Sequence, residues 1–132
     1  MKKVLYLVLI SVAVISCKKT EFSPEGPTDV RVKNISDVTF KEVIVKIKEE
    51  TDTLGDIVSG DTSEYHRFEI AYSKAEISAK INGILFSTGA VDYTYMDYKG
   101  QVRLTYVVYI SSMTKKELTI DDVKIEEPLV LK

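Results

Sequence analysis

The sequence has almost no sulfur or imidazole chemistry. Its 132 residues include one cysteine, Cys17, one histidine, His66, and no tryptophan. A single cysteine excludes an internal disulfide and argues against a thiolate metal site, so the chain has to fold on a hydrophobic core alone. The absence of a Cys–Trp–Cys core excludes a true antibody domain but leaves the immunoglobulin-like architecture open.

A basic excess is also missing. The 18 lysine and arginine residues stand against 20 acidic ones, for a net charge of −2. Two of the lysines, Lys2 and Lys3, lie in a leader that we expect to be removed, which leaves a net charge of about −4 on the rest. Nucleic acid requires a concentrated basic face, so this composition argues against a nucleic-acid partner.

No apolar run is long enough to span a bilayer. The longest, Val4–Ile15, has 12 residues and is interrupted by Ser11, whereas a spanning helix needs about 20. The run follows the basic tip at Lys2 and Lys3 and ends before a small residue and Cys17. This order is typical of a secretory signal rather than of a buried helix.

The four residues Val14-Ile15-Ser16-Cys17 resemble a bacterial lipobox. The resemblance implies that segment 1–16 is a lipoprotein signal peptide and that Cys17 carries two or three acyl chains such as palmitate, which anchor the protein in a membrane. Each buried CH₂ contributes about 0.8 kcal/mol, and stable attachment needs more than one chain. An ordinary cleaved signal and an uncleaved anchor are the alternatives. In lipoproteins an aspartate after the cysteine favours the inner membrane, and Lys18 in its place favours the outer membrane of the cell envelope.

Residues 17–28 form the predicted lipidated tether, because the stretch is polar and holds two prolines and a glycine. Alternation of apolar and polar residues then predicts one β domain over residues 29–132. We expect this domain to fold alone from Asp29 onward.

Seven segments carry the strand pattern, and no segment has a helical stripe. Asn82-Gly83 is a two-residue hairpin signal. A phase change at Asp121-Asp122 predicts a β-bulge or a break in the strand. The polar segment Glu49–Ser63 is expected to be a connection with a short edge strand. These features predict an all-β fold, a single antiparallel immunoglobulin-like β-sandwich of about seven strands, with a small barrel as the alternative. The predicted strands are Val30–Lys33, Phe40–Lys48, Glu64–Tyr72, Ala75–Ile81, Ile84–Phe86, Gln101–Ser111 and Leu118–Ile125.

Four short strings resemble uncharacterised small β-sandwich envelope lipoproteins of bacteria with two membranes. They are Gly60-Asp61-Thr62-Ser63-Glu64-Tyr65, Ala71-Tyr72, Ile81-Asn82-Gly83 and Asp97-Tyr98-Lys99-Gly100. The likeness that they mark spans most of the chain after Cys17. The resemblance implies a fold and a location and brings no activity.

Tyr93, Tyr95 and Tyr98 are the candidate ligand-binding residues. They lie in the tyrosine-rich segment Val91–Tyr98, which we expect to be a strand. Tyrosine adds contact area with a polar tip, so three of them suit a platform for sugar or peptide. The favoured alternative is packing, because Tyr93 and Tyr95 would share one strand face. We expect at least one of these two to pack inward. Separately, a tyrosine near the corner of a sandwich often bonds back to the backbone.

The remaining polar residues point to neither a catalytic site nor a metal site. His66 is expected to be structural, because no Gly-x-Ser-x-Gly elbow surrounds the nearby Ser63. Asp52, Asp56 and Asp61 lie in the acidic segment 49–61, which keeps calcium as an alternative to a solvated loop. No cofactor is expected.

Two functions from different classes fit this sequence. The first is a membrane-anchored envelope lipoprotein that acts as a non-enzymatic binding or assembly module, with an envelope protein or glycan as partner. The alternative is a small envelope enzyme or enzyme inhibitor acting on sugar or peptide. A pair of carboxylates in a cleft would mark the enzyme, and strand sequences alone do not reveal such spacing.

Overall fold

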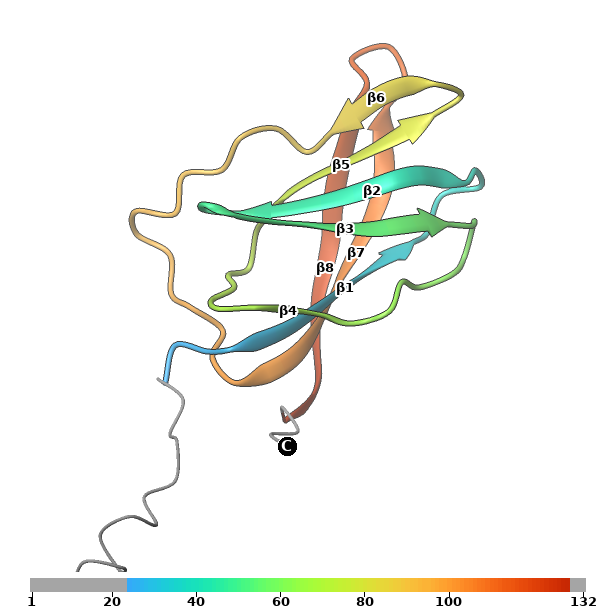
Figure 1. Ribbon diagram of the computed structural model, residues 1–132. Coiled ribbons are helices and arrows are strands. Elements are labelled where there is room, and N and C mark those ends of the chain that lie inside the picture. The colour runs from blue at the N-terminus through green and yellow to red at the C-terminus, as the bar shows by residue number, and fades with distance from the viewer. Residues whose placement is uncertain (1–23, 129–132) are drawn as a thin grey trace, which may run out of the picture.

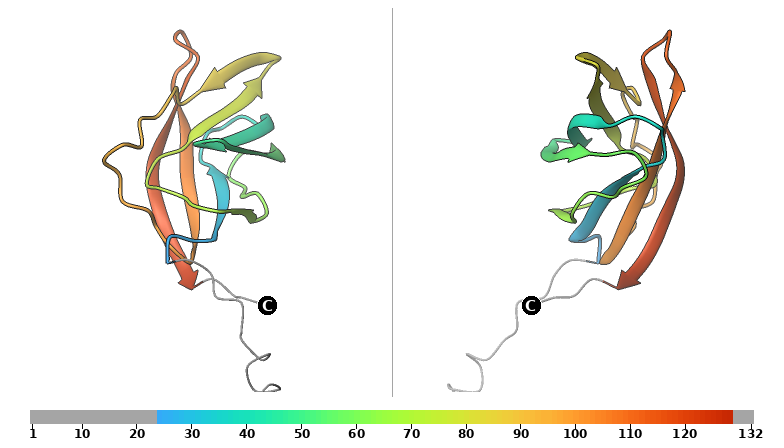
Figure 2. Two further views of the ribbon diagram at one scale, coloured as in Figure 1. Left: turned by 60° about the vertical axis from the view of Figure 1, so that its left-hand side comes forward. Right: turned by 90° about the vertical axis from the view of Figure 1, so that its right-hand side faces the viewer.

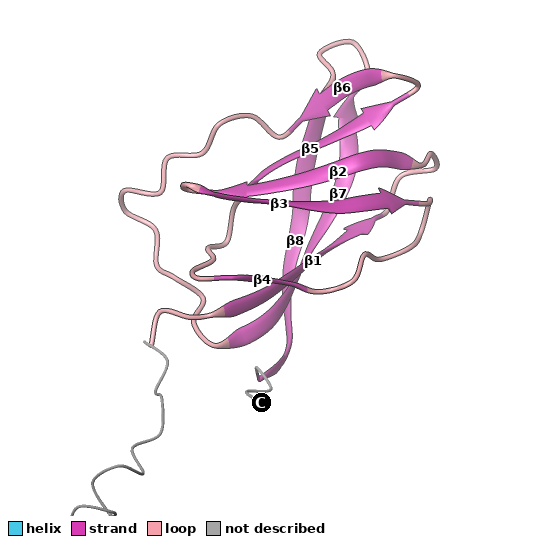
Figure 3. Cartoon of the chain, in the orientation of Figure 1, coloured by secondary structure: helices cyan, strands magenta, loops and turns pink. Residues whose placement is uncertain are grey.

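The computed structural model describes residues 24–128, which fold into strands and loops without a helix (Figures 1 and 3). This confirms the all-β prediction. The strands are β1 (Thr28–Asn34), β2 (Phe40–Ile47), β3 (Glu50–Ile57), β4 (His66–Phe68), β5 (Glu76–Ile81), β6 (Ile84–Ser87), β7 (Val102–Ser112) and β8 (Glu117–Pro128).

All eight strands belong to one mixed sheet with the order β3-β2-β5-β6-β8-β7-β1-β4. The predicted antiparallel arrangement of about seven strands is therefore corrected. β1 runs parallel to β7 over six paired positions, and β6 runs parallel to β8 at the single pair Ser87↔Glu117. A period-two pattern reports which face of a strand is buried and contains no information about the direction of its neighbour.

The sheet curves until it is nearly a barrel. Figure 2 shows β2, β3, β5 and β6 on one side of the molecule and β7 and β8 on the other. β3 and β4, the two edge strands of the sheet, approach each other because the sheet curves. His66 Nδ1 of β4 lies 2.8 Å from Asp52 Oδ2 of β3. Just beyond β4, the backbone N–H of Glu69 donates to Glu50 Oε1 at 2.8 Å. These two contacts hold the seam between the edges.

The inward faces follow the predicted alternation. Along β5, Ile77, Ala79 and Ile81 are buried while the residues between them are not. The largest fully enclosed side chains at the centre of the core are Phe40, Phe68, Phe86 and Tyr106.

A bulge in β2 lets two residues three positions apart face the core. Phe40 and Val43 are both fully buried, and the register with β3 shifts between them. Glu42 adopts φ 49°, and its N–H donates to Asp56 Oδ1 at 3.0 Å. This backbone hydrogen bond, together with Lys41 at 3.1 Å, holds the pKa of Asp56 below its usual value.

Two predicted local features are confirmed. Asn82 and Gly83 turn β5 into β6 with φ of 52° and 78°, the positive values that a tight hairpin needs. Val107 of β7 pairs with Asp122 of β8, while Val108, the next residue of β7, pairs with Ile120 of β8. Asp121 is the extra residue of that bulge.

Three predicted boundaries are corrected. Most of the supposed connection 49–63 is the strand β3, whose polar residues are tolerated because it lies at the sheet edge. β4 has three residues rather than the nine of 64–72. Residues 88–101 contain no strand, so the tyrosine-rich segment is a loop.

The domain also starts before Asp29, inside the predicted tether. β1 begins at Thr28, which is fully buried and donates its hydroxyl to Gly100 O at 2.6 Å. Gly26 and Pro27 are buried as well. A Cβ on Gly26 would come within 1.9 Å of Glu69 O, so this position requires glycine. The polar and proline-rich composition concealed a segment that closes the end of the sheet.

Candidate binding groove beside strand β8

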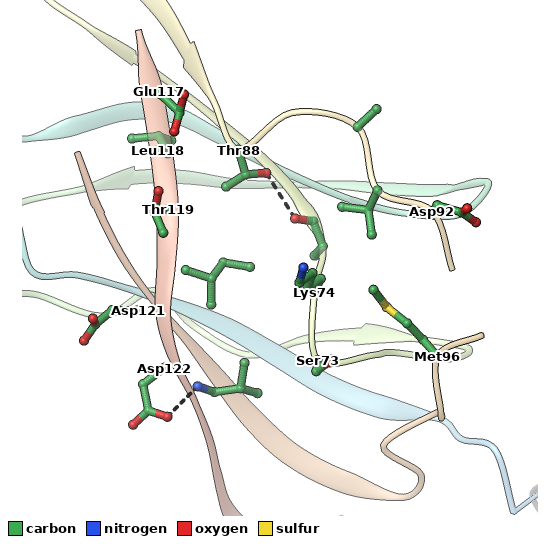
Figure 4. A pocket seen from close by; sticks show the side chains of 15 residues that line it. Ser73, Lys74, Thr88, Asp92, Met96, Glu117, Leu118, Thr119, Asp121 and Asp122 are labelled. Carbon is green, nitrogen blue, oxygen red and sulfur yellow. Dashed lines mark hydrogen bonds between the residues drawn. The ribbon is translucent and has the colours of Figure 1, made fainter. Parts of the chain in front are cut away.

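A groove of about 700 Å³ opens between the upper half of β8, the segment before β5 and the loop after β6. Its walls come from residues 73–75, 88, 90–92, 96 and 117–123. Figure 4 shows Asp121 and Asp122 of β8 on one side, with Asp92 and Met96 of the loop on the other. The volume lies in the range of small-molecule and peptide sites.

One wall of the groove is an open strand edge. β8 pairs with β7 along its whole length, from Ser112↔Glu117 to Val102↔Pro128. On its other side, β6 pairs only at Ser87↔Glu117. Within residues 24–128, no strand pairs with this side of β8 from Leu118 onward. Alternate N–H and C=O groups of β8 therefore face the groove. The N–H of Val123 donates to Asp122 Oδ1 at 2.8 Å, and the other groups on this side are available to a further strand.

Thr88 explains why β6 leaves β8 so early. Its hydroxyl accepts the N–H of Ile77 at 2.9 Å and donates to Ala75 O at 3.1 Å, and its own N–H donates to Ile77 O at 2.9 Å. These three bonds hold the chain after β6 against the start of β5. The chain is thereby drawn away from β8, and the groove opens between them.

The floor of the groove is apolar. Leu118 is 1% exposed and belongs to the core, and Ile120, Val123 and Met96 are half-buried against it. The half-buried Ile120, Val123 and Met96 offer apolar surface to a bound segment without losing their own packing.

The rim of the groove is acidic. Asp92, Glu117, Asp121 and Asp122 are exposed along it, and Lys74 is the basic residue among the lining side chains. Thr94 donates from its hydroxyl and its N–H to Asp92, which holds the pKa of this carboxyl below its usual value. The excess of carboxylates gives the groove a negative potential.

Tyr93 and Tyr95 lie in a loop and do not share a strand face, so that part of the prediction is wrong. Tyr93 packs on Tyr72 with ring centroids 5.0 Å apart, and its hydroxyl donates to Lys46 O at 3.3 Å. Burial raises the pKa of Tyr93. Tyr95, by contrast, is 98% exposed and Tyr98 is 46% exposed. The inward packing of at least one tyrosine is confirmed by Tyr93, and ligand binding by the three stays a prediction.

His66 and Ser63 have separate partners. His66 contacts Asp52 across the seam, and the Ser63 hydroxyl accepts the N–H of Val32 at 3.0 Å and donates to Glu64 O at 2.9 Å. Neither side chain is directed at the other as a nucleophile and base would be.

The acidic segment 49–61 is largely engaged in cross-strand contacts. Asp52 pairs with His66, and Asp56 pairs with Lys41. In the part of the chain that the structure describes, no three His, Cys, Asp or Glu side chains come together as metal ligands. The calcium alternative gains no geometric support from these residues.

All three arginines of the chain meet on the outer face of β1, β4 and β7, which the sequence analysis did not foresee. Arg67 Nε lies 2.8 Å from Asp29 Oδ1, and Arg103 Nε lies 4.0 Å from Asp29 Oδ2. The guanidinium groups of Arg31 and Arg103 lie 4.5 and 5.2 Å from the ring centroid of Tyr65. The cluster joins three strands through charge and cation–π contacts.

The groove residues were present in the sequence analysis only as strand and bulge positions. Leu118 and Ile120 fall in the predicted strand Leu118–Ile125, and Asp121 falls at its change of phase. The one usable signal was the end of the pattern after Phe86, which indicates that the strand from Ile84 is too short to cover a 12-residue neighbour.

The predicted lipidation site, Cys17, lies outside the described residues. Within residues 24–128, no helix has the length and apolar character needed to cross a membrane.

No protein-family model matches the chain, and no curated protein matches it either. Among solved structures, the NMR structure of a protein from Eubacterium rectale is similar over 83% of this chain and 100% of that chain, with 15% sequence identity and a TM-score of 0.49. At that level the similarity supports no argument about function. The described residues themselves define the class: an all-β domain with an apolar, acid-rimmed groove along an unpaired strand edge.

Proposed function

We propose that this chain is a lipoprotein of the bacterial cell envelope, anchored through lipid on Cys17, and that its β domain is a non-enzymatic binding or assembly module. The observation that carries the binding role is the groove along β8. Its apolar floor, charged rim and unpaired strand edge are the features with which sheets bind partners.

Within this proposal the fold is a strongly curved immunoglobulin-like sandwich. The halves β3-β2-β5-β6 and β8-β7-β1-β4 face each other over one core and are joined by the single pair Ser87↔Glu117. This weak join supports a description as two packed sheets. In this description, the second sheet contains the parallel pair β1 and β7.

The anchor rests on the lipobox-like segment and on the position of the domain ends. Thr28 at the start of β1 bonds to Gly100, and Val102 pairs with Pro128 at the end of β8. Both ends of the described chain therefore lie at one end of the molecule (Figure 1). The groove uses β8 residues 117–123, nearer the opposite end, where an anchored domain would present it to the envelope.

Replacing the cysteine tests the anchor. We expect Cys17→Ser to move the protein from the membrane fraction to the soluble fraction and to abolish labelling with a palmitate analogue, because no acyl acceptor remains. The matched control is Ser16→Ala, which keeps a small residue before the cysteine and should stay membrane-bound and labelled. Retention of Cys17→Ser in the membrane fraction would contradict the anchor, and density separation of the two membranes tests the preference for the outer one.

A small envelope enzyme acting on sugar or peptide remains the second candidate, because one observation favours it. The carboxylates of Asp92, Asp121 and Asp122 line the same groove, as a pair of catalytic acids would. The lowered pKa of Asp92 suits a permanently charged carboxylate rather than a general acid. Release of sugar or peptide from envelope material, lost in Asp121→Asn, would establish this function instead.

A further inference from the structure

We propose that the groove binds an extended peptide segment rich in lysine or arginine, which adds to β8 as a further strand. This inference rests on the proposed role of the groove as a binding site and names the chemistry of its occupant.

The backbone of β8 provides the template. The groove follows residues 117–123 of this strand, and β6 occupies only the first of those positions, at Glu117. At about 3.3 Å per residue, the remaining positions span about 20 Å, enough for a strand of six residues. Main-chain hydrogen bonds to such an edge supply affinity that does not depend on the sequence of the peptide.

The walls of the groove set the side-chain pattern of that peptide. An added strand directs alternate side chains to opposite faces. One set would meet the apolar floor at Ile120 and Val123. The other set would lie at the rim, where Asp92 and Asp121 are exposed. The matching ligand therefore alternates apolar and basic residues.

Charge also argues against a second copy of this chain as the occupant. Pairing two β8 edges would bring Glu117, Asp121 and Asp122 of each copy together, and like charges across a strand pair are destabilising. A basic strand meets the same carboxylates with opposite charge.

Three seven-residue peptides test the proposal on the full chain purified in detergent. The first alternates valine and lysine, the second replaces lysine with glutamate, and the third is the lysine peptide with alternate backbone nitrogens methylated. We expect the lysine peptide to bind at least tenfold more tightly than either of the others. The glutamate peptide is repelled by the rim, and the methylated peptide lacks the N–H groups that would pair with β8.

Two charge-reversed variants locate the binding. Asp121→Lys changes the rim, and we expect it to weaken the lysine peptide at least fivefold. Asp61→Lys makes the same charge change at an exposed position outside the groove and should leave affinity within twofold. Binding should also slow the amide hydrogen exchange of alternate residues between Thr119 and Val123, which a purely electrostatic association would not do.

Equal affinity for the lysine and methylated peptides would overturn strand addition, as would no binding of any peptide. Equal affinity for the glutamate peptide would overturn the basic specificity. Dimers in sedimentation that are lost in Asp121→Lys would assign the edge to a second copy. If the protein binds a chito-oligosaccharide but none of the peptides, and Asp121→Lys weakens that binding, the peptide assignment is overturned. The proposed binding function would then still hold. Retention of Cys17→Ser in the membrane fraction would contradict the lipid anchor alone and would leave the peptide-binding proposal unaffected.

Discussion

Tyr93 and Tyr95 lie two residues apart in the sequence and have opposite environments. Tyr93 is half-buried on Tyr72 and bonds to the backbone of β2, whereas Tyr95 is almost fully exposed. The difference arises because their segment is a loop, in which side chains two positions apart are under no constraint to share a face. The residue with the packing role and the residue available to a ligand are therefore different tyrosines.

Truncation of the two tyrosines separates these roles. We expect Tyr93→Ala to lower the free energy of unfolding by about 1–3 kcal/mol, less than the 3–5 kcal/mol of a fully buried ring, because Tyr93 is only half-buried. Tyr95→Ala is the matched control and should change stability by less than about 0.5 kcal/mol. Urea melts of both variants measure the difference, and wild-type stability in Tyr93→Ala would contradict the packing role.

Asp29 shows how one residue can organise several strands. It is 8% exposed and stands in register between Arg67 of β4 and Arg103 of β7. Two guanidinium groups next to one carboxylate keep that charge compensated where burial would otherwise disfavour it. The hydrogen bond to Asp29 raises the pKa of Arg67 above its ordinary value.

At the scale of elements, the first strand depends on residues that resemble a tether. Thr28, at the start of β1, pairs with Phe68 of β4 and bonds to Gly100 before β7. It thus ties together the ends of three segments that are far apart in the sequence. Pro27, buried just before it, extends this closure.

Shortening the chain tests that role. We expect a fragment of residues 29–132 to fold but to be less stable than residues 24–132 by about 2–4 kcal/mol, because it lacks the buried side chains of Pro27 and Thr28 and one hydrogen bond. Urea unfolding of the two fragments makes the comparison. Thr28→Val in the longer fragment removes only the hydroxyl and should cost about 0.5–1.5 kcal/mol, since Gly100 O still accepts the N–H of Val102. Equal urea midpoints for the two fragments would contradict this role and would place the start of the domain at Asp29.

At the scale of the whole molecule, buried phenols couple the fold to alkaline pH. Tyr106 is fully buried and donates its hydroxyl to Tyr72 O. Burial raises its pKa well above the ordinary value of 10.0, because the charged phenolate is disfavoured in the core. Burial also raises the pKa of Tyr65 and of Tyr93.

A raised pKa gives a definite sign to the pH dependence. The unfolded chain loses the Tyr106 proton near pH 10, where the folded chain still holds it, so stability is fully present below pH 10 and falls above it. For Tyr106 we expect a slope of up to about 1.4 kcal/mol per pH unit. Urea midpoints between pH 8 and 11.5 measure this decline, and Tyr106→Phe should flatten it while lowering stability at pH 8. An unchanged slope in Tyr106→Phe would contradict the assignment.

Local features of this protein were determined by the sequence itself. The alternation in 75–81 fixed the buried face of β5, Asn82-Gly83 fixed its hairpin, and the change of phase at Asp121 fixed the bulge in β8. Each depends on residues close together in the chain, because strand burial has a period of two and tight turns need positive φ.

Only the tertiary structure decided the pairing directions, the loop around Tyr93 and the groove. The groove exists because Thr88 draws the chain after β6 onto β5, which leaves one side of β8 unpaired thirty residues further on. Pairing between distant strands depends on how the whole sheet curves over a shared core. No local pattern encodes that curvature, so the edge that defines the candidate site was not visible in the residues that form it.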